Sequence, residues 1–154
     1  MITTLQGSLT VPDLGLPPID QIGFVVRDFD VARAAYSRLF GPCEERVVSV
    51  SAVCYRGRPA DSRFRVAFFR SGPIELEVIA ILEGDSIHSE FLGAGREGLE
   101  HVRFPVLDVD ATVARLQAVG YRPVYGARVP GLYDFEYLEH DEHPGTYIEL
   151  VRFH

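Results

Sequence analysis

The sequence predicts an α+β fold made of two βαβββ modules, and a long internal repeat is the main observation behind this prediction. The stretch "IDQIGFVVRDFDVARAAYSRLFG" at 19–41 and the stretch "LEHVRFPVLDVDATVARLQAVGY" at 99–121 share one order of features. In each, a short β-branched run is followed by apolar residues at helical spacing. Strand-like segments separated by turn-forming Gly and Pro follow each copy. A unit present only twice is not a solenoid, so we expect the two copies to pair around one sheet-lined cavity.

The elements of the first copy follow in chain order. Residues 19–26 are expected to form a strand, and 27–41 a helix that Asp28 or Asp30 caps and Gly41 ends. The apolar residues that we place on or near one face of this helix are Val31, Ala34, Ala35, Leu39 and Phe40. Three strands are then expected, at "RVVSVSAVCYRG", "RFRVAFFRSG" and "PIELEVIAIL".

The second copy repeats this order at an offset of 80 residues, at which Gln21 falls on His101, Asp28 on Asp108 and Ala34 on Ala114. The strands expected after its helix are "RPVYGARV", "YDFEYLEH" and "GTYIELVRF". Between the copies, residues 86–92 are expected to form a short helix, and "GAGREG" a flexible turn.

These elements divide the chain into four segments of one structural domain. Residues 1–18 form an N-terminal arm, rich in Gly, Pro and Thr and without sustained periodicity. The first module spans 19–83, the connector 84–98 and the second module 99–154. With 154 residues, of which 47% are apolar, the chain is long enough to fill one shared core.

Charge and composition disfavour several classes of partner. The 15 basic and 22 acidic residues give a net charge of −7 with no block of like charges, which argues against nucleic acid and anionic membranes as partners. The sequence has neither the pattern of a signal peptide at its start nor an apolar run that could span a bilayer, so we expect a cytoplasmic protein. Cys43 and Cys54 lack CxxC spacing and indicate neither a zinc knuckle nor a disulfide scaffold.

Four stretches carry a resemblance to a known family. They are "IDQIGFVVRDFDVARAAYSRLFG", "LEVIAILEGDSIHSEFL", "GLEHVRFPVLDVDATVARL" and the closing "GTYIELVRF". With them, residues 19–153 resemble the vicinal oxygen chelate superfamily, which includes glyoxalases, methylmalonyl-CoA epimerases, extradiol dioxygenases and bleomycin-resistance proteins. Within this superfamily the sequence is most similar to the branch of methylmalonyl-CoA epimerases and glyoxalase-like proteins.

This resemblance implies that the modules pair curved mixed sheets around one cleft, with one metal ligand on the first and last strand of each module. Carried over by position, the ligands are Gln21, a glutamate of "PIELEV", His101 and Glu149. Glu75 and Glu77 lie two apart on one strand and so share a face. Comparison of the two "IEL" triplets favours Glu75, whereas the spacing onward to "EGDS" favours Glu77. We take Glu77 as the ligand and keep Glu75 as a neighbour of the ligands or a proton acceptor.

The chemistry of this ligand set can be judged independently. Two carboxylates, an imidazole and an amide oxygen suit one divalent ion, Zn, Ni, Co, Mn or Mg, in a five- or six-coordinate site that water or substrate completes. Where the epimerase-like pattern has His this sequence has Gln21, and some glyoxalases of the family use Gln at the matching position. The iron dioxygenases need two His and one carboxylate, and only His101 stands at a ligand position here, so that activity is disfavoured.

The expected function is that of a metal-dependent lyase or isomerase acting on a small carbonyl compound or thioester, by proton transfer next to the carbonyl. Glu149 and Glu75 are the expected catalytic bases. The alternative is a metal-free small-molecule binding protein on the same fold, like the antibiotic-sequestering members of the superfamily. Homodimerisation is implied by the resemblance.

Several further residues are candidates for the cleft. Those expected to bind substrate are Tyr55, Arg56, Phe68, Tyr133 and Tyr137, with Arg56 in a loop suited to a carboxylate or phosphate. His88, in the connector, is expected to be solvated.

Overall fold

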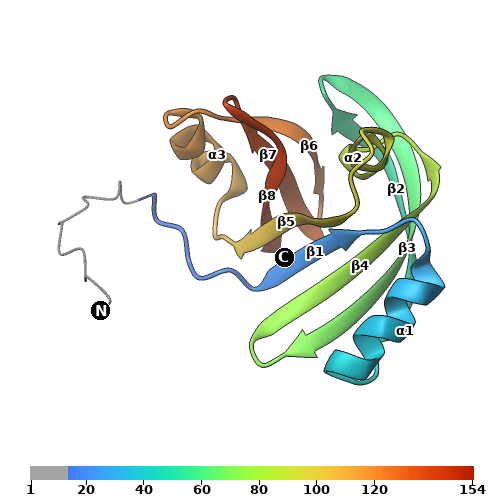
Figure 1. Cartoon of the computed structure of the whole chain (residues 1–154). Coiled ribbons are helices and arrows are strands. Elements are labelled where there is room, and N and C mark those ends of the chain that lie inside the picture. The colour runs from blue at the N-terminus through green and yellow to red at the C-terminus, as the bar shows by residue number, and fades with distance from the viewer. Residues whose placement is uncertain (1–13) are drawn as a thin grey trace, which may run out of the picture.

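The structure is a computed structural model and describes residues 14–154 (Figure 1). The first thirteen residues of the expected N-terminal arm lie outside the described residues. Residues 14–20 form no regular element, but Leu14 and Leu16 pack against the apolar cluster under the last helix. The backbone carbonyl of Leu14 accepts a hydrogen bond of 3.0 Å from Arg115.

The described chain has a mixed α+β fold in which eight strands close into a single barrel. The strands are β1 (Gln21–Val25), β2 (Glu44–Tyr55), β3 (Arg58–Ser71), β4 (Ile74–Gly84), β5 (Gly98–Pro105), β6 (Tyr121–Val129), β7 (Tyr133–His140) and β8 (His143–Phe153). Their order around the barrel is β1-β4-β3-β2-β6-β7-β8-β5. Strands of the two halves of the chain therefore join in one closed sheet.

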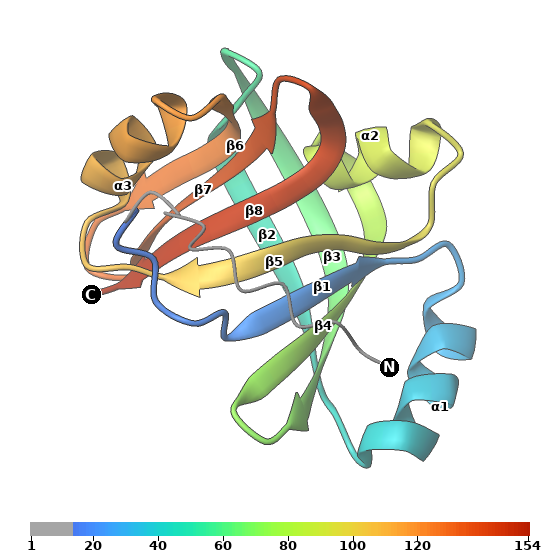
Figure 2. The same ribbon diagram turned by 60° about the vertical axis from the view of Figure 1, so that its left-hand side comes forward.

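The barrel closes through two contacts of different extent. Strands β1 and β5 pair antiparallel along most of their length, whereas β2 and β6 pair only at Cys54–Gly126 and Tyr55–Tyr125. Within the halves, β1 runs parallel to β4 and β5 runs parallel to β8. Figure 2 shows β1 and β5 lying side by side across the front of the barrel.

Three helices lie outside the barrel: α1 (Phe29–Phe40), α2 (Ile87–Gly93) and α3 (Val109–Gln117). Asp28 and Asp108 cap α1 and α3 at equivalent positions, each accepting a hydrogen bond from the backbone N–H three residues on. Gly41 follows the last residue of α1 with φ of 87°, which glycine adopts without strain. Helix α1 packs on β3 and β4, and α3 on β6, β7 and β8 (Figure 1). In residues 14–154 no helix is long and apolar enough to cross a membrane.

The buried face of α1 differs from the one expected. Val31 and Leu39 are 65% and 72% exposed. The helix instead buries the stripe formed by Phe29, Ala32, Tyr36 and Phe40 against the sheet. This stripe recurs at the helical repeat starting from Phe29, which lies next to the cap and anchors the helix on β3 and β4.

The largest apolar cluster fills the barrel, and both halves contribute to it. It includes Val25, Val66 and Ile79 from the first half and Val124, Phe135 and Val151 from the second. Two smaller clusters lie between the sheet and the helices α1 and α3. The interior of the barrel is therefore mainly apolar, so polar side chains inside it call for an explanation.

A salt-bridged cluster joins the two halves and the connector. Arg56, in the turn between β2 and β3, contacts Glu139 on β7 at 2.8 Å and Glu90 on α2 at 2.8 Å. Glu139 is buried and also accepts a hydrogen bond of 2.9 Å from Arg122. Burial alone would raise the pKa of Glu139, but its hydrogen bonds with Arg56 and Arg122 outweigh burial and lower it.

Replacing Arg56 by Met is expected to lower the free energy of unfolding by about 1–3 kcal/mol, because it leaves the buried Glu139 carboxylate with less compensation. Urea denaturation measures the loss. The matched control is Arg63→Met, whose salt bridge to Glu83 is exposed on both sides and is expected to contribute less than about 0.5 kcal/mol.

The same pair of variants gives a pH test. The contribution of a carboxylate with a lowered pKa is present above its ordinary pKa of 4.5 and is lost as the pH falls below it. The stability difference between the wild type and Arg56→Met should therefore narrow below pH 4.5. A difference that stays constant down to pH 3 would assign the effect of Arg56 to packing instead.

Candidate functional site

The strand register gives the expected ligands equivalent positions in the two halves. In the parallel pair β1–β4, Gln21 lies opposite Glu75 and Gly23 opposite Glu77. In the parallel pair β5–β8, His101 lies opposite Tyr147 and Arg103 opposite Glu149. In the first pair, Glu77 lies two residues after Glu75, the residue opposite Gln21. In the second pair, Glu149 lies two residues after Tyr147, the residue opposite His101. By this symmetry the counterpart of Glu149 is Glu77.

Four side chains meet at the Nε2 atom of His101. This nitrogen is 3.3 Å from Gln21 Oε1, 3.6 Å from Glu77 Oε2 and 3.5 Å from Glu149 Oε2. Gln21 and His101 are almost completely buried. Glu149 Oε2 is itself buried and has no hydrogen-bond partner among the described residues.

The side chain of Glu75 determines how Gln21 is oriented. Its Oε1 accepts a hydrogen bond of 2.8 Å from the amide nitrogen of Gln21. An ionised carboxylate offers only acceptors, so the NH₂ group of Gln21 must face Glu75 and its carbonyl oxygen must face His101. Glu75 is also paired with Arg70 and Arg103.

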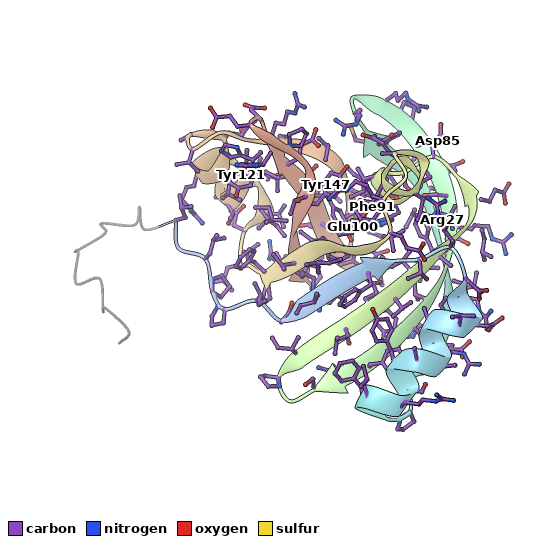
Figure 3. All side chains as sticks on the ribbon, viewed as in Figure 1. Arg27, Asp85, Phe91, Glu100, Tyr121 and Tyr147 are labelled. Carbon is purple, nitrogen blue, oxygen red and sulfur yellow. The ribbon has the colours of Figure 1, made fainter. Side chains whose placement is uncertain are left out.

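Glu100 determines the orientation of His101 in the same way. Its Oε2 lies 2.9 Å from His101 Nδ1, and its Oε1 lies 2.8 Å from Nδ1 of His88. Burial alone would raise the pKa of Glu100, but its interactions with His88 and His101 outweigh burial and lower that pKa to about 2. Figure 3 shows Glu100 inside the molecule, beside β5 and below α2. An ionised Glu100 accepts the Nδ1 hydrogen of His101, and when the ring is neutral this leaves the Nε2 lone pair for the centre of the site.

His101 occupies space that only a glycine on the neighbouring strand leaves open. Gly23 lies opposite His101 in the β1–β5 pair. A Cβ atom at position 23 would lie 1.8 Å from His101 Cε1, far inside van der Waals contact. The His101 imidazole can therefore take its observed position only because residue 23 has no side chain.

The two carboxylates of the site are strongly affected by burial. Burial raises the pKa of Glu77 to about 7, with His101 acting in the opposite direction and Glu149 adding to the rise. Burial also raises the pKa of Glu149, against the charges of His101 and Arg103. For His101, burial alone would lower the pKa, but the hydrogen bond and charge of Glu100 outweigh it and raise the pKa. At both carboxylates burial therefore outweighs the nearby positive charge, and each pKa stays above its ordinary value.

The site opens into a cavity of about 280 Å³ inside the barrel. Gln21, Glu77 and Glu149 line one part of it, together with His88 and Arg103. The remaining wall is apolar or aromatic and consists of Val48, Val50, Phe64, Val66, Phe68, Ile79, Tyr125, Tyr133, Phe135, Tyr137, Val151 and Phe153. A mainly apolar cavity with a few convergent polar groups is the usual form of a small-molecule site.

Three of the five residues expected to bind substrate line this cavity: Phe68, Tyr133 and Tyr137. Tyr55 and Arg56 do not line it. The Tyr55 hydroxyl donates to Glu90, and the Arg56 guanidinium is held by Glu90 and Glu139. Arg56 lies in the turn between β2 and β3, where its positive charge is paired with the carboxylates of Glu90 and Glu139.

Sequence reasoning missed three residues of the site. The expectation that His88 is solvated is wrong: its side chain is 4% exposed, because α2 places it against the barrel. Glu100 was not singled out, although its position next to His101 was a signal for a residue that orients it. Arg103 lies opposite Glu149, lines the cavity and is held by Asp20 at 2.8 Å.

The donor atoms around His101 have the chemistry of ligands to a metal ion. No group of three or more His, Cys, Asp and Glu side chains in residues 14–154 is arranged as a ready-made metal site. The chemistry of the four side chains nevertheless fits a divalent cation, because Gln21 Oε1, a lone pair on His101 Nε2 and the two carboxylates are all acceptors. Acceptors that converge without a donor repel one another, and a cation between them removes that repulsion.

The sequence matches a known protein family over residues 20–135, the Glyoxalase/Bleomycin resistance protein/Dioxygenase superfamily. No curated protein matches the sequence.

Solved structures with the same fold include methylmalonyl-CoA epimerases. That of Mycobacterium tuberculosis is 22% identical, with 96% of this chain and 94% of that chain covered and a TM-score of 0.62. A Streptomyces coelicolor methylmalonyl-CoA epimerase in complex with 2-nitronate-propionyl-CoA is 23% identical, covers 90% of this chain and 95% of that chain, and has a TM-score of 0.64. A hypothetical protein from Bacillus halodurans is 16% identical, with 89% and 94% covered and a TM-score of 0.61. At these identities the likeness shows the fold.

The substitution Gly23→Ala is expected to displace His101 and to lower the free energy of unfolding by about 1–3 kcal/mol through overpacking. The His101 ring signals in an NMR spectrum report the displacement, and urea denaturation reports the stability. The control is Gly93→Ala, because a Cβ atom at position 93 has open space around it. Unchanged His101 signals in Gly23→Ala would contradict the close approach described here.

Proposed function

The chain belongs to the Glyoxalase/Bleomycin resistance protein/Dioxygenase superfamily, and we propose that it is a metal-dependent lyase or isomerase. In this proposal the enzyme moves a proton on the carbon next to the carbonyl group of a small substrate. The family and the methylmalonyl-CoA epimerase neighbours support a glyoxalase- or epimerase-like activity. Because one scaffold hosts several activities, the argument for this reaction rests on the site.

One observation carries the proposal: four acceptor groups converge inside an apolar barrel. Gln21 Oε1 and the carboxylates of Glu77 and Glu149 all lie within 3.6 Å of His101 Nε2. Two largely buried carboxylates next to one imidazole nitrogen are costly unless a positive charge compensates them. A structural role would be served better by apolar side chains of similar size, whereas a cation site needs these acceptors.

We propose that Gln21, Glu77, His101 and Glu149 hold one divalent metal ion. When bound, the ion would polarise the substrate carbonyl and stabilise the negative charge that develops on its oxygen. Glu75 and Glu100 hold the ligands in place: Glu75 turns the Gln21 carbonyl oxygen inward, and Glu100 fixes the tautomer of His101.

Glu149 is the proposed base. Its Oε2 atom is buried at the cavity and has no hydrogen-bond partner among residues 14–154. The Glu149 carboxylate is also a proposed ligand, and a carboxylate beside a metal can detach and take the α proton of a substrate. The proton then resides on the Glu149 carboxyl group and returns to the substrate carbon or to a neighbouring atom. Glu77 lines the same cavity and is the second candidate for this role. Glu75, bound to Gln21, is proposed to position that ligand rather than to accept the proton.

The cavity supports a small substrate with an apolar part. Its volume of about 280 Å³ lies just below the usual range of small-molecule sites, about 300–1,000 Å³. Phe68, Tyr133 and Tyr137 are proposed to contact the substrate. The ligands named for the epimerase structures, 2-nitronate-propionyl-CoA and methylmalonyl-CoA, are acyl-CoA thioesters. A small carbonyl compound or thioester is therefore the proposed substrate class.

We also propose that the halves of the chain are two βαβββ modules, at 19–83 and 99–154 on either side of a connector. The order of elements supports this, because β1-α1-β2-β3-β4 recurs as β5-α3-β6-β7-β8. The equivalent positions of Gln21 with Glu77 and of His101 with Glu149 support it further. A homodimer in the cytoplasm, expected from the sequence and the resemblance, stays part of the proposal.

The second candidate function is a metal-free small-molecule binding protein. The raised pKa of His101 favours it, because a protonated imidazole would itself supply the positive charge between the acceptors. In that case Nε2 donates a hydrogen to a carboxylate, and the cavity binds its ligand without chemistry.

Metal content separates the two candidates. Protein purified without chelator or affinity tag is expected to carry about one equivalent of a divalent metal by elemental analysis. The variants Glu77→Ala and His101→Ala should lose it, because each removes a charged or imidazole donor. Glu83→Ala, an exposed carboxylate on the same strand as Glu77, is the control that should keep it. No metal after dialysis against Ni²⁺, Co²⁺, Mn²⁺ and Zn²⁺ would support the binding protein.

Proton exchange tests the proposed reaction. In deuterated water the metal-loaded protein is expected to exchange the α proton of a 2-methyl acyl thioester or of a methylglyoxal hemithioacetal. Glu149→Gln should slow this exchange by at least about 100-fold, the usual effect of removing a general base. Exchange that survives this substitution unchanged, in protein that still binds metal, removes Glu149 from the role of base.

A further inference from the structure

His88, which the reaction proposed above does not use, is a buried imidazole on the wall of the cavity. It projects from α2 in the connector between the two halves. Its ring is edge-on to the rings of Phe64, Tyr125 and Tyr137 at centroid distances of 5.1, 5.9 and 5.5 Å. Three aromatic neighbours in this arrangement hold the orientation of the ring.

Glu100 determines which nitrogen of His88 carries the hydrogen. His88 Nδ1 lies 2.8 and 2.9 Å from the two carboxylate oxygens of Glu100. Since an ionised carboxylate only accepts, Nδ1 donates, and a neutral ring keeps its lone pair on Nε2. Among residues 14–154 this Nε2 atom makes no hydrogen bond, although the side chain is more than nine-tenths buried.

Two of the other polar groups that line the cavity are already paired. The hydroxyl of Tyr125 is hydrogen-bonded to Ser62 at 3.1 Å. Arg103 is held by Asp20 through two hydrogen bonds. The Nε2 atom of His88 is therefore an acceptor of the cavity that is separate from the acceptor cluster around His101.

We propose that His88 recognises a hydrogen-bond donor of the bound molecule, with Nε2 accepting from a hydroxyl or N–H group. The rings of His88 and His101 are 6.2 Å apart, so the donor lies a few bonds from the group held at His101. The ligand class is a small, largely apolar molecule with a hydroxyl or N–H group. The expectation that this molecule also has a carbonyl group rests on the proposed function. The hydrogen bond between the molecule and His88 does not depend on that function.

The test uses phenol and fluorobenzene as probes, because they have nearly the same shape and only phenol has a donor. In the wild type, ¹⁵N NMR should show the Nδ1–H tautomer of His88, and phenol should shift the Nε2 resonance. Phenol should bind about five- to tenfold more tightly than fluorobenzene, since a hydrogen bond to a buried acceptor is gained. In His88→Phe this preference should disappear, and in the control His143→Phe, an exposed residue of β8, it should remain.

Three results would overturn the proposal: a hydrogen on His88 Nε2, an Nε2 resonance that phenol leaves unchanged, or a preference for phenol that survives in His88→Phe. The NMR measurements on the wild type need no variant and so do not depend on how His88→Phe folds. Metal content and proton exchange are measured on the same wild-type preparation. If the protein has neither bound metal nor proton exchange but still prefers phenol through His88, only the proposed function is refuted. If metal and exchange are present but the preference for phenol does not depend on His88, only the role of His88 is refuted.

Discussion

The carboxylate of Glu100, buried between two imidazoles, is the interaction on which the rest of the site depends. Its two oxygens accept from His88 on α2 and from His101 on β5. It therefore ties the connector to the barrel and fixes the tautomers of both rings. One ring presents its Nε2 lone pair to Gln21, Glu77 and Glu149, and the other presents its own to the cavity. Without this carboxylate, neither ring would have a defined donor and acceptor side.

The strand pairing supplies the frame for that interaction. Two parallel pairs, β1–β4 and β5–β8, meet in antiparallel orientation at β1–β5, which brings the first and last strands of both halves to one place. At this junction Gly23 lies opposite His101, and any larger residue would occupy the position of the imidazole. The matching register of the two parallel pairs and the missing side chain at Gly23 together account for the convergence of four side chains from four strands.

Much of this frame could be predicted from local sequence. Asp28 and Asp108 mark the starts of two helices, and β-branched runs between turn-forming Gly and Pro mark the strands, because caps and turns act over a few residues. The choice between Glu75 and Glu77 could not be made in this way. Both residues lie on one strand, and only the register against β1 shows that Glu75 contacts Gln21 and Glu77 faces the cavity. Register depends on contacts between distant strands, which a single sequence does not reveal.

The residues that sequence reasoning misplaced share a physical reason. Arg56 lies in a turn with Gly57 and Pro59, and His88 lies in the connector between two Gly-containing stretches; such segments are usually solvated. Both are held by carboxylates far along the chain or on another element, Arg56 by Glu139 and His88 by Glu100. A buried charged or polar group persists only when it is paired, so each such pair points to a constraint that local composition does not show. Arg56 and Glu139 satisfy each other and so stabilise the fold, whereas Glu149 Oε2 and the Nε2 atom of His88 make no hydrogen bond within residues 14–154. Unsatisfied acceptors at one apolar cavity are the observation that supports the proposed cation and ligand.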